Sequence, residues 1–227
     1  AVLMKGQARA ADPGGVGRAL AEKAKRMGAV FHRVGVHRIQ PDPKGGWTIH
    51  TDDGELEAER LVIAAGAWSA RLLAPLGYSL PLEAERGYHL VFKDPGITLN
   101  NSIMDADAKF VASSMAAGVR CAGTAEFAGL DTPPDYRRAR IFIRLAKNLL
   151  PDINTDDRIE WMGNRPSFPD SLPCLGKIPG QEALYCAFGH SHYGFGMAPN
   201  TGRVVAEVVA GALPNIEMEP YRVDRFR

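Results

Sequence analysis

The chain contains 227 residues, 45% of them hydrophobic and 23% charged, a composition typical of a globular protein with a substantial core. Its 27 lysine and arginine residues nearly balance its 26 aspartate and glutamate residues, for a formal net charge of +1. Because no strong basic field results, we expect no nucleic-acid partner. No apolar run approaches the ~18 residues needed to cross a bilayer, so we expect no transmembrane segment.

Three cysteines, Cys121, Cys174 and Cys186, are scattered along the sequence and form no CxxC pair. An odd number of cysteines without paired spacing favours a reducing compartment. The sequence therefore predicts a cytoplasmic protein, with peripheral attachment to the inner membrane as the alternative.

The first 80 residues predict a helix followed by strands. Asp12 caps an amphipathic helix that begins at Pro13 and ends before Gly28. Strand-like segments and then a short helix follow, in the order 29–39, 47–51, 55–65 and 68–73. Positions 61–65 are apolar throughout, as expected for a strand covered on both faces.

From residue 80 the pattern changes to antiparallel strands separated by Gly, Asp, Asn and Pro, at 82–92, 102–104, 109–113 and 119–127. A helix is predicted from 133 to about 150, with Ile141, Leu145 and Leu149 on one face. The remaining elements are a strand at 158–163, a proline-punctuated loop at 164–173, a strand at 183–188 and a helix at 199–211. The fold class is α/β (α+β): an α/β layer from residues 1–80 and 155–227, and a mainly antiparallel β domain with one helix at 81–154.

The corner after residue 188 is the strongest candidate for a binding site. A short apolar strand leads into a glycine-rich loop, Gly189 to Gly196, and then into a helix. Glycines let a ligand approach the backbone closely, and a helix N-terminus offers N–H groups and a positive dipole end to an anion. This corner can therefore cradle a cofactor.

Five side chains outside the glycines could carry chemistry. Arg165, in the proline-punctuated loop, can bind a carboxylate bidentately, or can be an ordinary surface or ion-paired arginine. Tyr88 and His89 point to opposite faces of one strand, so either could face a small-molecule site, although a packed tyrosine and a surface histidine are the commoner arrangement. His190 and His192 have a spacing seen in some metal sites, but no third ligand stands near, and a substrate-side or structural role is favoured over metal binding. We predict no metal site.

The sequence has no GxSxG elbow, HExxH motif or P-loop, and no complete GxGxxG after a strand. If a dinucleotide is bound, its pyrophosphate loop is not in these residues. The sequence nevertheless resembles the C-terminal part of the FAD-dependent D-amino-acid oxidase superfamily, closest to its D-amino-acid dehydrogenase-like branch and also similar to glycine oxidase. The resemblance is carried by 10–13 with its helix, 61–69 (LVIAAGAWS), 85–90 (ERGYHL), 161–173 (WMGNRPSFPDSLP) and 188–205 (FGHSHYGFGMAPNTGRVV).

The resemblance implies a flavin-binding layer that lacks its N-terminal Rossmann half, so that this chain is an excised or proteolysed C-terminal portion. Alone it is then expected to be inactive, to bind FAD weakly or not at all, and to expose an apolar layer that would allow homo-oligomerisation. The resemblance places Arg165 on the substrate carboxylate and Tyr88 or His89 over the flavin. The residues that it places near FAD are Val36, Ala65, Gly66, Trp68, Gly194, Phe195, Gly196 and Met197.

The activity implied is oxidative deamination of a D- or small amino acid, by hydride transfer from its α-carbon to FAD. One alternative is a secondary-amine substrate such as sarcosine or proline. A second alternative, from another class, is a non-catalytic interaction domain that does not hold FAD.

Overall fold

The computed structural model describes residues 2–6 and 8–226, and these form two compact units. The first contains the N-terminal segment through Phe31, Gly87–Glu126 and Pro133–Gly163. The second contains His32–Arg86, Phe127–Thr132 and the segment from Asn164 onward. Two of the boundaries between the units fall inside long strands, β5 (Glu83–Phe92) and β10 (Arg158–Ser167). No helix in the described part of the chain has the length and apolar character needed to cross a membrane.

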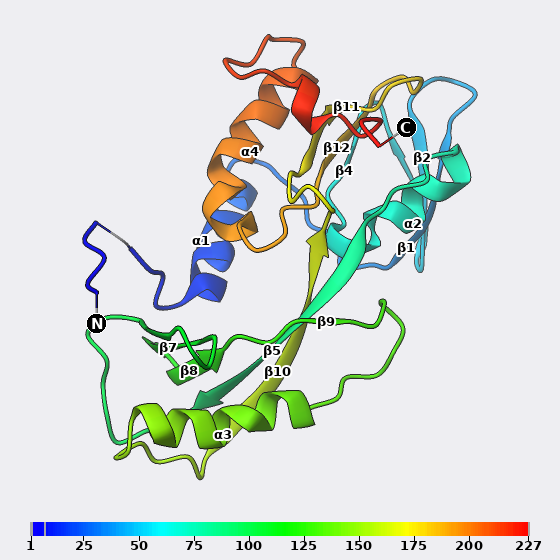
Figure 1. Cartoon of the computed structure of the whole chain (residues 1–227). Helices are drawn as coiled ribbons and strands as arrows, with labels where there is room; N and C mark the ends of the chain where they lie inside the picture. Colours follow the sequence, from blue (N-terminus) through cyan, green and yellow to red (C-terminus); the bar gives the residue numbers. More distant parts are fainter. Residues whose placement is uncertain (1, 7, 227) are drawn as a thin grey trace. The chain divides into compact units, whose positions relative to one another are not determined.

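The first unit has the antiparallel sheet predicted from the sequence. Its strands follow the order β10-β5-β8-β7-β6, with β9 also pairing with β5. The helix α3 packs against this sheet through Ala139, Phe142 and Ala146 (Figure 1). The remaining elements of this unit are α1 (Pro13–Arg26), β6 (Ile103–Asp105), β7 (Phe110–Met115), β8 (Gly118–Ala122), β9 (Glu126–Phe127) and α3 (Arg137–Leu149).

The buried face of α3 differs from the predicted one. Leu145 and Leu149 are partly buried against the core, but Ile141 is exposed. The buried positions 139, 142 and 146 follow the helical period of 3.6 residues, which turns Ile141 away from the sheet. The sequence predicts the face with the larger apolar side chains, because the two small alanines contribute little to the hydrophobic pattern of the helix.

The second unit contains two small sheets and the helix that covers one of them. One sheet is the antiparallel meander β1-β2-β3; the other has the order β11-β12-β4, with β11 and β12 antiparallel and β12 and β4 parallel. Helix α4 packs on β11 and β12 and buries Val204 and Val205 (Figure 1). The bounds are β1 (Val36–Pro41), β2 (Trp47–Thr51), β3 (Gly54–Ala58), β4 (Leu61–Ile63), η1 (Gly66–Trp68), α2 (Ser69–Leu73), η2 (Ala74–Leu76), β11 (Cys174–Lys177), β12 (Leu184–Phe188), α4 (Gly194–Val209) and η3 (Glu219–Tyr221).

Three predicted elements need correction in this unit. The strand expected from residue 29 begins only at Val36. Strand β4 is not covered on both faces, because Val62 is exposed. The last helix begins at Gly194 rather than Pro199, so that the glycines expected in a loop occupy its first turn.

Strand β10 also continues four residues beyond its predicted end, through Ser167. Pro166 does not end it, because β10 is the edge strand of its sheet and an edge position tolerates a residue without an N–H. Arg165 therefore lies on a strand and not in a loop.

Candidate active site

Two loops of the second unit meet at one edge of its parallel strand pair. Strands β4 and β12 run in register, with Ile63 opposite Cys186. The segment Ala65–Trp68 follows the end of β4, and the segment Gly189–Met197 follows the end of β12. Because the carboxyl ends of neighbouring parallel strands lie at the same edge of a sheet, these two predicted cofactor segments share that edge.

This edge presents apolar side chains and an open helix start. Trp68 and Phe195 are exposed, as is Val36 at the start of β1. The N-terminus of α4 carries no side-chain cap from Tyr193. A Cβ added to Gly196 would meet no atom within 4 Å, so the backbone of this first helical turn is approachable. An uncapped helix start of this kind favours an anionic or polar group.

The loop that precedes α4 is fixed to the end of β10. Gly189 has a φ of +87°, and a Cβ there would lie 2.3 Å from Cε2 of Phe168, so only glycine fits. The backbone N–H of Ser191 donates to the carbonyl oxygen of Pro166 at 2.9 Å. These two contacts bring His192 beside the strand segment that carries Arg165.

Glu85 joins three side chains from β10 and this loop. Its Oε1 accepts from Nη1 of Arg165 at 3.1 Å, and its Oε2 accepts from Oγ of Ser167 at 3.1 Å. Nε2 of His192 lies 2.7 Å from Oε1 and 2.9 Å from Oε2. The Glu85 side chain is only 9% exposed, whereas Arg165 is 28% and His192 53% exposed. We call these four residues the Glu85 cluster.

Glu85 lies in the ERGYHL segment, and the sequence analysis assigns it no role. The sequence signal for a role is that Glu85 is a carboxylate in a strand that otherwise reads as buried. A buried charge requires a partner, so this position predicts an ion pair or hydrogen bond. The partners themselves could not be read, because they lie 80, 82 and 107 residues away along the chain.

The two histidines of the loop have different surroundings. Nε2 of His190 is hydrogen-bonded to Oγ1 of Thr201 in α4 at 2.9 Å, and burial lowers the pKa of His190 from its usual 6.5. His192 instead contacts Glu85. In the part of the chain that the structure describes, no three His, Cys, Asp or Glu side chains gather in a way that could hold a metal ion.

Two buried polar atoms beside the Glu85 cluster bear on the fit of a ligand. Within the described ranges, Oδ1 of Asn164 and Oγ of Ser191 have no hydrogen-bond partner. Leaving such an atom unsatisfied costs about 1–3 kcal/mol, which a bound polar group can offset. Asn164 and Ser191 adjoin Arg165 and His192 in the sequence, and together with the open start of α4 and the exposed Trp68 and Phe195 their unsatisfied atoms are compatible with a large cofactor that carries polar groups, as FAD does.

Tyr88 and His89 belong to the first unit and point to opposite faces of β5, as alternation requires. Tyr88 is 1% exposed, and its hydroxyl donates to Oε2 of Glu126 at 2.6 Å and accepts from the backbone N–H of Asp135 at 3.1 Å. His89 stacks on Trp161, with ring centroids 4.7 Å apart. The pocket role of Tyr88 and His89 stays a prediction.

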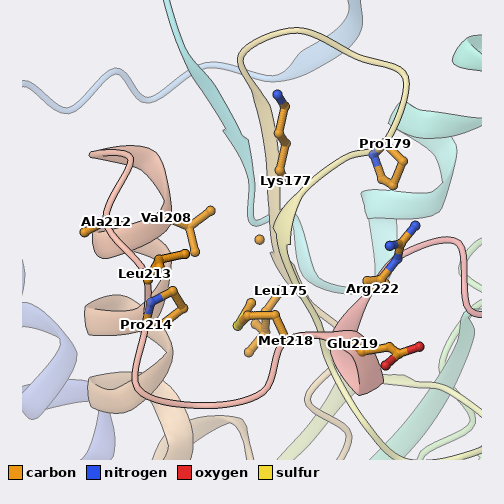
Figure 2. A pocket seen from close by; sticks show the side chains of 11 residues that line it. Leu175, Lys177, Pro179, Val208, Ala212, Leu213, Pro214, Met218, Glu219 and Arg222 are labelled. Carbon is orange, nitrogen blue, oxygen red and sulfur yellow. The ribbon is translucent and has the colours of Figure 1, made fainter.

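Two hollows of the second unit are lined in part by α4 and β11. The larger, about 600 Å³, has mainly apolar walls from the end of α4, β11 and the segment after α4, with Lys177 and Arg222 at its rim (Figure 2). It contains none of the predicted site residues. The smaller, about 290 Å³, is lined in part by Gly196 and Met197, both predicted to contact the flavin.

Comparison with known proteins decides the family. Residues 1–208 match the family described as DAO, FAD dependent oxidoreductase. The chain belongs to this family of flavoenzymes. The predicted resemblance and fold class are confirmed, and FAD is the cofactor of the full-length proteins of this family.

Named relatives point in the same direction. A D-amino-acid oxidase of Bradyrhizobium diazoefficiens is 38% identical over 99% of this chain and 54% of its own length. A D-amino acid dehydrogenase of Paramagnetospirillum magneticum is 38% identical over 92% of this chain and 50% of its own. A glycine oxidase structure from Geobacillus kaustophilus is 27% identical with a TM-score of 0.80, over 92% of this chain and 56% of that one. This chain thus spans about half the length of the curated relatives that it matches.

Proposed function

We propose that this chain is one portion of a flavoenzyme that oxidatively deaminates a D- or small amino acid to an imino acid, which water then hydrolyses to a 2-oxo acid. The proposal is supported by the relatives' names and by one observation in particular. That observation is the partly exposed guanidinium of Arg165, anchored by Glu85 beside the loop that starts α4.

In this proposal Arg165 binds the substrate carboxylate and orients the α-carbon. A guanidinium matches a carboxylate geometrically, and its anchoring by Glu85 lowers the entropy that is lost on binding. Its contribution is orientation rather than proton transfer. Tyr88 or His89 is proposed to line the same pocket in the complete protein.

The cofactor-binding residues are proposed at the edge that β4 and β12 share. Val36, Ala65, Gly66 and Trp68 would contact the adenine, ribityl and phosphate parts of FAD, and the segment 194–197 would lie against its ring. FAD, when bound, supplies the oxidising chemistry by accepting a hydride from the α-carbon. The N-terminal dipole of α4 would stabilise negative charge placed next to it.

Two further predictions belong to this proposal. Alone, these 227 residues are proposed to be inactive and to hold FAD weakly or not at all, and the complete enzyme is proposed to be cytoplasmic. A secondary-amine substrate such as sarcosine or proline is the alternative for the same site, because Arg165 would bind its carboxylate equally well.

The experiment that tests this function is anaerobic reduction of the flavin in the complete protein that contains this chain. D-amino acids, glycine, sarcosine and proline are compared, and bleaching by the primary amino acids is the expected result. Arg165→Ala should raise KM by about 100-fold, since a charge-assisted pair is lost. The matched control is Arg203→Ala, because Arg203 pairs with Glu207 on the surface of α4. No bleaching by any of these compounds, or an unchanged KM in Arg165→Ala, would contradict the proposal.

A further inference from the structure

His192 and Arg165 are brought together by a shared carboxylate. Nη1 of Arg165 and Nε2 of His192 both contact Oε1 of Glu85, so the two nitrogens are no farther apart than the sum of 3.1 Å and 2.7 Å. An α-amino acid carries its amino group one carbon away from its carboxylate. A carboxylate bound at Arg165 therefore leaves the amino group within reach of a side chain placed as His192 is.

The carboxylate of Glu85 also fixes which nitrogen of His192 carries a proton. Glu85 receives hydrogen bonds from Arg165 and Ser167, which an ionised carboxylate accepts best. An ionised carboxylate has no donor, so Nε2 of a neutral His192 must carry the hydrogen that faces it. Nδ1 is then the basic nitrogen, and no described residue is hydrogen-bonded to it.

We propose that His192 is a catalytic residue that takes the proton of the substrate's ammonium group, and that Glu85 is the positioning residue that holds His192 and Arg165 for this task. The proposal rests on the function proposed above, because it requires an amino acid whose carboxylate is bound at Arg165. It assigns a base to a reaction for which the sequence offered none.

The proton transfer is needed because an ammonium nitrogen has no lone pair. One N–H bond of the ammonium group breaks, its electron pair stays on nitrogen, and the proton forms a bond with Nδ1 of His192. The lone pair so released would be available for the C=N bond of the imino acid, and FAD, when bound, would supply the oxidant for the hydride of the α-carbon. With half of its side chain exposed, His192 can return the proton to water.

The charged and titratable groups that contact His192 are limited. Glu85 of β5 contacts it directly, and Arg165 of β10 contacts the same carboxylate. His190 of the same loop is turned to Thr201 of α4 instead. A purely structural ion-pair network would use the same contacts, so the test must separate the two roles.

Two probe ligands separate amino-group recognition from carboxylate recognition. Isobutyrate and 2-aminoisobutyrate both lack an oxidisable C–H beside an amino group, and they differ only in that group. The FAD-loaded complete protein should bind 2-aminoisobutyrate about tenfold more tightly, as expected for a hydrogen bond to a charged group. His192→Ala should abolish this preference and leave isobutyrate affinity unchanged, whereas Arg165→Ala should weaken both ligands.

A second readout concerns the proton itself. In His192→Gln, which keeps a donor toward Glu85, the rate of flavin reduction at saturating substrate should fall and should rise steeply with pH, because only amine that is already neutral reacts. Added imidazole should restore the rate in His192→Ala. If both variants kept the wild-type pH profile and ligand preference, this inference would be overturned. Failure of every amino acid to bleach the flavin would instead overturn the function itself.

Discussion

Each of the two units contains a glutamate that is largely shielded from solvent and contacts an arginine and a hydroxyl group. Glu85 joins an arginine, a histidine and a serine. Glu126 joins Arg138, at 2.7 Å from Nε, and the hydroxyl of Tyr88. Because both glutamates pair with an arginine and accept from a hydroxyl group, these shared contacts alone do not identify a site.

The difference lies in what surrounds each glutamate. The Glu85 cluster leaves half of His192 exposed and lies beside unsatisfied polar atoms and a glycine-fixed loop. Tyr88 is fully buried among apolar residues, and its hydroxyl accepts from the backbone N–H of Asp135, just before α3. The Glu126 contacts thus fasten the start of α3 to its sheet, whereas the Glu85 cluster presents its charges outward.

The largest expected effect comes from removing each glutamate in turn. Glu85→Ala leaves a partly buried arginine without its carboxylate and should lower the free energy of unfolding by about 3 kcal/mol. It should also weaken isobutyrate binding at least tenfold. Glu126→Ala should destabilise without changing ligand affinity. Urea unfolding measures the stability of both variants, and ligand titration measures their affinity for isobutyrate. If Glu126→Ala weakened binding as much as Glu85→Ala, the proposed difference between the two glutamates would be wrong.

A similar loss of stability is expected at the loop. Gly189→Ala introduces a Cβ at a positive φ and 2.3 Å from Phe168, which should cost about 2–3 kcal/mol. The control is Gly196→Ala, where a Cβ meets nothing within 4 Å. Its unfolding free energy should change by less than about 1 kcal/mol, while FAD affinity of the complete protein falls. Equal stability of the two variants would show that the loop is not held by Phe168.

A smaller loss of stability is expected when the hydroxyl of Tyr88 is removed. Tyr88→Phe removes the hydroxyl that Glu126 and the N–H of Asp135 share, so stability should fall by about 1–2 kcal/mol. If Tyr88 serves only to hold α3, KM for the amino acid stays at the wild-type value. A several-fold rise in KM would instead support the pocket role that family resemblance gives to Tyr88.

The smallest effect concerns pH and His190. Burial lowers the pKa of His190 below its usual 6.5, so the unfolded chain binds this proton more readily. The stability that the neutral histidine contributes is therefore present above pH 6.5 and is lost as the pH falls. His190→Gln should flatten the decline in unfolding free energy below pH 6.5. If the slope of unfolding free energy against pH stayed unchanged, His190 would not be the group that causes this decline in stability.

Much of the fold follows from local signals. Asp12 and Pro13 define the start of α1, where Asp12 accepts from the N–H of Gly15 at 2.7 Å, as a capping residue should. The antiparallel strands follow from alternation and turn residues. By contrast, the sequence predicts a loop at Arg165, because a proline such as Pro166 normally ends a strand inside a sheet. A strand at the edge of a sheet tolerates proline, and the sequence does not show which strand lies at the edge.

The candidate site was predictable in its residue types but not in its connections. The glycine-rich corner is visible in the sequence as a strand, a glycine-rich loop and a helix, whereas Arg165 by itself also fits an ordinary surface or ion-paired arginine. The one local signal at Glu85 is a carboxylate in a strand that reads as buried, and this signal does not name the partners of that carboxylate. Only the pairing of β5 with β10, and the contact of the 189–193 loop with Pro166, bring the cluster together.

The central claim is that Arg165, held by Glu85, binds the carboxylate of the substrate. The most direct measurement is the affinity of isobutyrate for the FAD-loaded complete protein, followed by the flavin absorbance, in Arg165→Met and in the control Arg203→Met. We predict that affinity falls about 100-fold in Arg165→Met only, with the flavin content unchanged, since a charge-assisted bidentate pair is lost. Equal affinity in the two variants would contradict the account.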